Sequence, residues 1–209
     1  MTTDGKNFGA QDKFIKETLS TLHNKRNMFN ETWKLYSIIE NPLDRFAATF
    51  VNNCIHKNNN KLEENLCYGC MNSPTCVINY LYKNLKKLMS LQNHFYNPNE
   101  IDRKFMPYYW RCNMQKDYTL FQMFNYTNPI MFNNQLQKLF QKTNIQEKEI
   151  VLVMKRIKEF YANNNNINKF NQLKSEVIKS IFNDRNAFFQ FMSIYYTDYQ
   201  YFNILVPQI

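Results

Sequence analysis

The chain has 209 residues and a formal net charge of +9, and 44% of its residues are apolar, including 18 Phe and 14 Tyr. This composition excludes a disordered protein and supplies enough apolar side chains for one buried core. No run of about eighteen apolar residues occurs, which excludes a helix that spans a membrane. With only 3 glycines, the sequence lacks the glycine-rich loops that hold dinucleotides or nucleotide phosphates.

The first fifth of the chain predicts two helices. Asp12 is a helix-capping residue followed by apolar side chains at helical spacing, so a helix is expected there, after an N-terminal arm of residues 1–11. A second helix is expected from Asn30. Its inward residues are Trp33, Tyr36 and Ile39. It is expected to end before Pro42, because the residue that precedes a proline disfavours the α region.

The clearest helical pattern lies between residues 42 and 93. Pro42 favours the first turn of a helix. The apolar stripe that follows consists of Leu43, Phe46, Ala47, Phe50, Val51, Cys54 and Ile55. Ser73 and Pro74 cap and open another helix after a polar, Asn-rich loop. The two helices predict a central antiparallel hairpin over about residues 42–93.

The remainder of the chain is also read as helical. Prolines interrupt residues 95–130, where short helices and ordered loop are expected. Asn144 and Glu147 resemble a capping box that opens a helix, and further helices are expected around residues 170–181 and from Asp184. No pattern of period two is longer than a few residues. The sequence therefore predicts an all-α fold, an irregular multi-helix bundle that forms a single domain over residues 1–209.

Four of the five cysteines lie in the stretch "CIHKNNNKLEENLCYGCMNSPTC", which begins at residue 54. In an antiparallel hairpin, Cys54, Cys67, Cys70 and Cys76 all meet at one end. Three interpretations stay open: a structural zinc site of four thiolates, two disulfides in an oxidising compartment, or reduced thiols of which Cys54 is a core residue. A helix–loop–helix with four cysteines is similar in part to the small hairpins with twin C-x9-C pairs of the mitochondrial intermembrane space, although the spacing differs.

The segment 184–209 is rich in aromatic residues on more than one side of the expected helix. Such a helix must be buried on more than one side, either within its own fold or against a partner. We predict that the segment docks a partner protein. The expected interface residues are Phe188, Phe189, Tyr195, Tyr196, Tyr199 and Phe202.

Catalytic motifs are hard to find in this sequence. The three histidines, His23, His56 and His94, are far apart, and nothing favours a catalytic pair of His94 with Cys112. No cofactor is expected apart from the zinc of the first cysteine interpretation. No catalytic residue is predicted, and the chain is read as non-enzymatic.

These observations lead to a functional interpretation. We expect a structural accessory subunit of a large multiprotein assembly, of the respiratory-chain type, on the intermembrane-space side of the mitochondrial inner membrane, with a cytoplasmic location as the alternative. Its expected partners are protein subunits, and no specific nucleic acid. The alternative function is a zinc-stabilised helical module that binds nucleic acid or sits in a ribonucleoprotein, which the charge of +9 favours.

Overall fold

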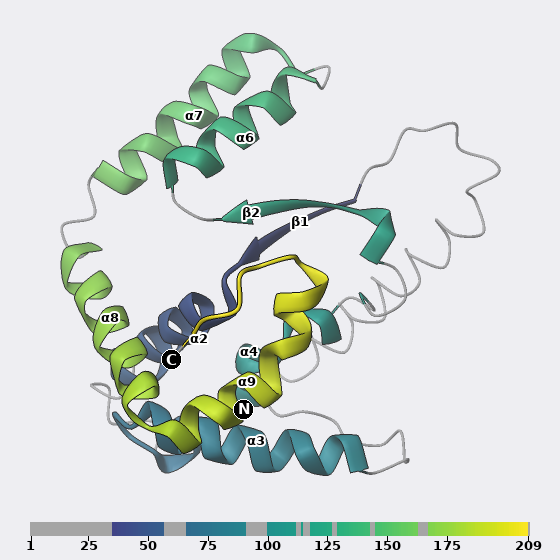
Figure 1. Cartoon of the computed structure of the whole chain (residues 1–209). Helices are drawn as coiled ribbons and strands as arrows, with labels where there is room; N and C mark the ends of the chain where they lie inside the picture. Colours follow the sequence, from purple (N-terminus) through teal and green to yellow (C-terminus); the bar gives the residue numbers. More distant parts are fainter. Residues whose placement is uncertain are drawn as a thin grey trace, which may run out of the picture.

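The computed structural model describes residues 35–56, 66–90, 100–111, 114, 118–126, 129–142, 145–162 and 167–208. These residues form a small parallel sheet surrounded by helices (Figure 1). The N-terminal arm of residues 1–11 and the helix expected after Asp12 lie outside the described residues. The same is true of His23, His94 and Cys112.

The sheet consists of two parallel strands, β1 (Leu35–Glu40) and β2 (Phe121–Tyr126). The register places Leu35 opposite Phe121 and Glu40 opposite Tyr126. The all-α prediction is therefore wrong. Parallel strands need a long connection, and here it contains α3 (Pro74–Ser90) among other elements.

The helix predicted from Asn30 fails because its six described residues, LYSIIE, form a strand. Ile39 is buried while Tyr36 and Ile38 are exposed, so alternate residues face opposite sides as in a strand. Six residues before a proline are too few to distinguish period two from the helical period. The proline itself also favours extended backbone before it.

Most helix predictions after residue 42 are confirmed. The helix with the clearest sequence pattern is α2 (Pro42–Phe50), which continues into a π-helical segment (Val51–Ile55). The other helices near it are α3, α8 (Ile167–Asn183) and α9 (Arg185–Tyr201). Shorter elements follow one another in the middle of the chain: Leu66–Gly69, α4 (Glu100–Phe105), Tyr108–Trp110 and Tyr118–Leu120. Beyond β2, α6 (Pro129–Gln141) packs on α7 (Glu147–Ala162), as Figure 1 shows.

The pairing of the helices differs from the predicted hairpin. α3 packs most extensively against α9, and α2 packs most extensively against α8. The predicted central pair of residues 42–93 is therefore not the centre of the fold. The centre is α9, which contacts α3, α8 and α2 and has buried residues along its length.

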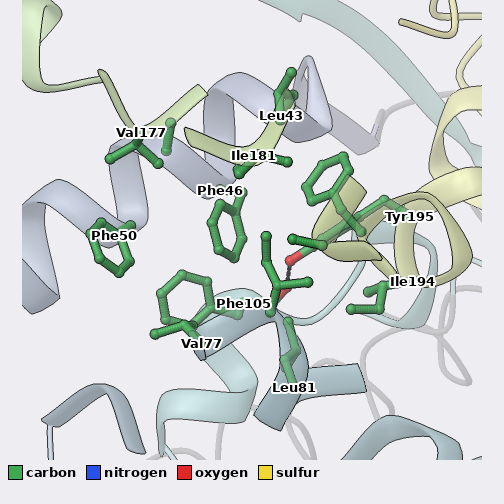
Figure 2. Packing of buried hydrophobic residues seen from close by; sticks show 14 of the residues in the cluster. Leu43, Phe46, Phe50, Val77, Leu81, Phe105, Val177, Ile181, Ile194 and Tyr195 are labelled. Carbon is green, nitrogen blue, oxygen red and sulfur yellow. Dashed lines mark hydrogen bonds between the residues drawn. The ribbon is translucent and has the colours of Figure 1, made fainter. Parts of the chain in front are cut away.

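The main core lies where α2, α3, α4, α8 and α9 meet (Figure 2). Its largest fully buried side chains include Phe46, Phe50, Phe105, Phe191 and Tyr195. The ring of Phe46 contacts Phe105, Phe191 and Tyr195, with ring centroids 5.1, 5.8 and 6.4 Å away. Burial of each such side chain contributes roughly 1.5–3 kcal/mol, so this aromatic cluster provides much of the stability of the fold.

A smaller cluster joins the sheet to the end of α9. Ile39 of β1, Met114 and Phe202 are buried together there. None of the described helices has both the length and the hydropathy that a membrane span requires.

Candidate functional site

The junction between β1 and α2 is the first candidate position for a ligand. β1 ends at Glu40 and α2 begins at Pro42, so Asn41 alone links the strand to the helix. In α/β folds, ligands bind outside the carboxyl ends of the strands, and the N-terminus of a helix attracts anions. The junction therefore has the two backbone features that commonly accompany an anionic ligand.

The backbone N–H groups of the first turn of α2 are largely engaged within the protein. Oδ1 of Asn41 accepts a hydrogen bond from the N–H of Leu43 at 2.9 Å. The N–H of Arg45 donates to the carbonyl oxygen of Asn41, also at 2.9 Å, and Pro42 has no N–H. The hydroxyl of Tyr199 in α9 donates to the same Oδ1 at 3.2 Å. Asn41 is thus a helix cap that is fixed from a second element.

Two carboxylates, Glu40 and Asp44, and two cations, Lys174 and Arg45, influence the charge at this junction. Burial raises the pKa of Glu40, the nearby Lys174 opposes this shift, and Asp44 adds to it. Nζ of Lys174 in α8 lies 2.8 Å from Oδ1 of Asp44. One ammonium group therefore faces two carboxylates, and it is already paired with one of them.

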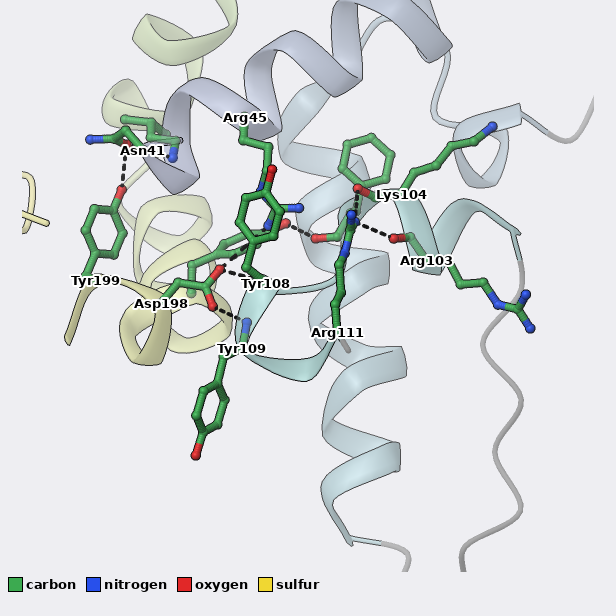
Figure 3. Close-up of polar contacts among 12 residues, drawn as sticks. Asn41, Arg45, Arg103, Lys104, Tyr108, Tyr109, Arg111, Asp198 and Tyr199 are labelled. Atoms are coloured by element: carbon green, nitrogen blue, oxygen red, sulfur yellow. Dashed lines mark hydrogen bonds and ion pairs between the residues drawn. The ribbon is translucent and has the colours of Figure 1, made fainter. Parts of the chain in front are cut away.

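A buried polar network lies deeper, between α2, α9 and the segment Tyr108–Trp110 (Figure 3). Asp198 is fully buried, and its carboxylate accepts the backbone N–H groups of Tyr108 at 2.8 Å and Tyr109 at 2.9 Å. Nη2 of Arg45 lies 3.7 Å from Oδ2 of Asp198, which is close enough for an ion pair but too long for a hydrogen bond. Burial raises the pKa of Asp198, while these N–H groups and Arg45 oppose the shift.

Arg45 is only 6% exposed and sits among aromatic rings. Its guanidinium carbon lies 4.3 Å from the ring centroid of Tyr108 and 5.5 Å from that of Tyr195. These distances allow cation–π attraction in a desolvated setting. Nε and Nη2 of Arg45 have no hydrogen-bond partner within the described protein atoms. Arg45 is consequently held by one carboxylate and two rings, facing away from solvent.

A second guanidinium completes the network. Nη2 of Arg111 donates to the carbonyl oxygens of Arg103 at 2.6 Å and Lys104 at 3.1 Å, in the last turn of α4. Burial lowers the pKa of Arg111, and the neighbouring Arg45 lowers it further. The hydroxyl of Tyr195 donates to the carbonyl oxygen of Phe105 at the end of the same helix. Together these contacts connect α4, α2 and α9. The network therefore has a structural role rather than a catalytic one.

The four predicted cysteines pair as two disulfides, Cys54–Cys67 and Cys70–Cys76. Their sulfurs are therefore not available as a set of four thiolate ligands, and no group of three or more metal-ligating side chains occurs within the described residues. The disulfide interpretation agrees with this arrangement, whereas the zinc and reduced-thiol interpretations do not. The first bridge ties the π-helical segment to the short helix Leu66–Gly69, and the second ties Cys70 to the first turn of α3.

The predicted docking residues of the aromatic segment divide into two groups. Phe188, Tyr195, Tyr199 and Phe202 are at most 7% exposed, so they belong to this chain's own core and are not available to a partner. Phe189 and Tyr196 are 66% and 48% exposed. A partner interface on α9 is therefore limited to the outer face of that helix, since its other faces pack within the fold.

Sequence reasoning missed Arg45 and gave Asp198 no role beyond marking a polar side of its helix. A signal for both was present. Arg45 interrupts an apolar stripe between Leu43 and Phe46, and Asp198 is the only acidic residue in α9. Charges of opposite sign among the apolar residues of two buried helices are compatible with a buried pair.

Comparison with known proteins gives the class of this chain. A model of the Sulfotransferase family matches residues 3–204, and the chain belongs to that family. Among curated proteins of Caenorhabditis elegans, it is similar to the "Putative sulfotransferase vep-2", with 29% identity over 118 residues, which cover 54% of this chain and 36% of that protein. It is also similar to the "Carbohydrate sulfotransferase chst-1", with 26% identity over 97 residues, which cover 45% of this chain and 29% of that protein.

A third relative in the same organism, the "Uncharacterized protein C18B2.2", is 30% identical over 138 residues, which cover 63% of this chain and 36% of that protein. The chain thus spans about a third of the length of the curated relatives it matches. No solved structure matches it significantly.

Family membership contradicts the non-enzymatic interpretation and both functions that were expected from the sequence. Sulfotransferases are enzymes with an α/β fold, so the chain is neither a non-enzymatic accessory subunit of a respiratory-type complex nor a zinc-stabilised nucleic-acid-binding module. The parallel pairing of β1 and β2 agrees with this fold class. The sequence reasoning failed because it looked for local catalytic motifs, which this chain does not display.

Proposed function

We propose that this chain takes part in sulfuryl transfer to a hydroxyl group of a carbohydrate. The observation that carries the proposal is the family match over residues 3–204. The acceptor class follows the printed name of one relative, a carbohydrate sulfotransferase. The parallel strand–helix junction of β1 and α2 supports the assignment to an α/β enzyme.

Sulfotransferases use 3′-phosphoadenosine 5′-phosphosulfate, PAPS, as the sulfuryl donor. This donor carries several phosphate and sulfate charges, so it needs N–H donors and cations. The β1–α2 junction does not fit this requirement, because Asn41 occupies the N–H of Leu43 and two carboxylates stand beside it. Arg45 and Arg111 do not supply the missing charge, since Arg45 is buried against Asp198 and Arg111 binds the end of α4. We infer that the donor is not bound at the β1–α2 junction.

The disulfides support a proposal about the compartment. Disulfides persist in oxidising environments, such as the secretory lumen, the cell exterior or the mitochondrial intermembrane space. Cys54 and Cys67 are fully buried where they pair. We propose an oxidising compartment for this chain. The intermembrane-space location and the protein partners expected from the sequence stay predictions.

The proposed activity can be measured by transfer of radioactive sulfate. The protein, purified without reductant, is incubated with PAPS labelled with ³⁵S and with a panel of neutral and acidic polysaccharides. We expect label on at least one polysaccharide, and none on it when the protein is heat-denatured. A variant with Glu159→Gln, which changes an exposed residue of α7, serves as the matched control and should transfer label equally. Absence of label across the panel, with protein that melts cooperatively, would contradict the proposal.

A further inference from the structure

The β1–α2 junction has the backbone geometry of an anion site, but its side chains oppose an anion. We infer that Glu40 and Asp44 close this junction to phosphate and sulfate groups. This inference concerns where the sulfuryl donor can bind, which the proposed activity does not specify. Three features of the structure lead to it, namely the state of the N–H groups, the local charge and the direction of Arg45.

The N–H groups give the first argument. A helix N-terminus binds an anion through the free N–H groups of its first turn. In the first turn of α2, Pro42 has no N–H and the N–H of Leu43 is taken by the Asn41 side chain, which leaves the N–H of Asp44, a residue that itself carries a carboxylate. The bond from Tyr199 holds the Asn41 side chain in place. An anion would therefore have to displace a cap that is anchored from α9.

The local charge at the junction also opposes an anion. Glu40 stands at the last position of β1, and Asp44 stands in the first turn of α2. Acidic residues at this end of a helix stabilise it and occupy the place that an anionic ligand would take. Lys174 faces both carboxylates but is paired with Asp44 at 2.8 Å. These three side chains have a net negative charge when both carboxylates are ionised, and the buried Arg45 offsets part of the charge of Glu40.

The direction of the Arg45 side chain also matters, because Arg45 is the first cation of α2. Its side chain is 93% buried and is directed at Asp198 and at the ring of Tyr108, as Figure 3 shows. It also lies near the ring of Tyr195. To reach an anion at the junction, it would have to give up its ion pair with the fully buried Asp198. Breaking a buried pair in this way is strongly unfavourable. Arg45 lowers the pKa of Glu40 and so offsets part of that charge, but its pairing with Asp198 keeps it from binding an anion at the junction.

The test uses inorganic pyrophosphate as the probe and hydrogen exchange of the first turn of α2 as the readout. The charge-removing variant is Glu40→Gln with Asp44→Asn. The control is Glu147→Gln with Glu149→Gln, which removes the same charge from two exposed acids in the first turn of α7. The full chain is used throughout, and circular dichroism melting establishes that each variant is folded.

We expect pyrophosphate to leave exchange at residues 43–45 unchanged in the wild-type chain and in the control. In the charge-removing variant, exchange there should slow, at a pyrophosphate concentration at least about tenfold below any that affects the wild-type chain. Removal of two unit charges within several ångströms of a bound phosphate supports an effect of this order. If the double variant does not fold, Glu40→Gln alone serves, with a smaller gain expected.

Two results would overturn the inference. One is slower exchange at residues 43–45 of the wild-type chain at the same pyrophosphate concentration as in the variant. The other is a folded variant that gains nothing, because the carboxylates would then not be the cause of closure. Adenosine 3′,5′-bisphosphate, tested in parallel, separates this inference from the proposed function. If it slows exchange elsewhere in the chain, donor binding is supported while the junction remains closed.

Discussion

Replacement of Asp198 by Ala should be among the most damaging single changes in this protein. The substitution removes the acceptor for the N–H groups of Tyr108 and Tyr109, at 2.8 and 2.9 Å, and the carboxylate that forms an ion pair with Arg45. Each N–H left buried without a partner costs about 1–3 kcal/mol. Removal of one partner of a buried ion pair costs about 3–5 kcal/mol. These costs overlap, so we expect a loss of about 4 kcal/mol in the free energy of unfolding.

The conservative variant separates the two contributions. Asp198→Asn retains an oxygen that accepts one of the two N–H groups, but it lacks the charge that faces Arg45. We expect a loss of about 2–3 kcal/mol, intermediate between wild type and Asp198→Ala. Addition of Arg45→Met to Asp198→Asn removes the unpaired buried charge, so the double variant should be more stable than the sum of the two single changes predicts.

Urea unfolding followed by circular dichroism measures these differences, provided that the transition is two-state. The control is Glu159→Ala, which removes an exposed ion pair to Lys155 within α7, at 3.8 Å. Such a pair contributes at most about 0.5 kcal/mol. A loss below about 1 kcal/mol for Asp198→Ala, no larger than that of the control, would refute the reasoning that this network holds α9 to the segment Tyr108–Trp110.

Three further predictions follow from burial and charge. Glu40→Gln should stabilise the chain at pH 7. Burial raises the folded-state pKa of Glu40 above its ordinary value of 4.5, so the wild-type chain loses stability as pH rises through the folded-state pKa, and the Gln variant does not. The gain should vanish below pH 4.5, and urea midpoints across pH 3–8 measure it. The pair Cys54→Ser with Cys67→Ser should cost about 2–4 kcal/mol in chemical unfolding, and a melting temperature equal to wild type would contradict this. Phe191→Ala should cost about 3–5 kcal/mol, while Phe189→Ala, at a site 66% exposed, should cost less than about 0.5 kcal/mol in the same assay.

The helices were largely accessible to sequence reasoning because their signals are local. Pro42 stands at the start of α2, Pro74 at the start of α3, and Asp184 caps α9 through hydrogen bonds from two N–H groups at 3.0 Å. The strands were not accessible in this way. Leu35 pairs with Phe121, which lies far from it in the sequence, and a parallel pairing of two short segments leaves no local pattern beyond a few alternating residues.

The candidate site was less predictable than the helices. The polar network depends on Arg45, Tyr108 and Asp198, which come from three separate elements. The sequence shows that two of these are charges among apolar neighbours, but it does not show that they meet. The docking prediction for the aromatic segment was wrong for most of its residues for a related reason. A helix with aromatic residues on several sides is consistent with a partner surface and with a central core helix, and only the packing distinguishes them.

The central position of α9 has a consequence for biosynthesis. Tyr199 follows Asn41 by 158 residues, yet it anchors the cap of α2. During translation at roughly 5–20 residues per second, α2 and α3 emerge on the order of ten seconds before α9 exists. Through that interval the faces that α9 later covers stay open, and Cys54, Cys67, Cys70 and Cys76 are already exposed to oxidants. Correct pairing of the cysteines must then be directed by the local chain around them, and a chaperone that shields the open faces would raise the yield of native protein.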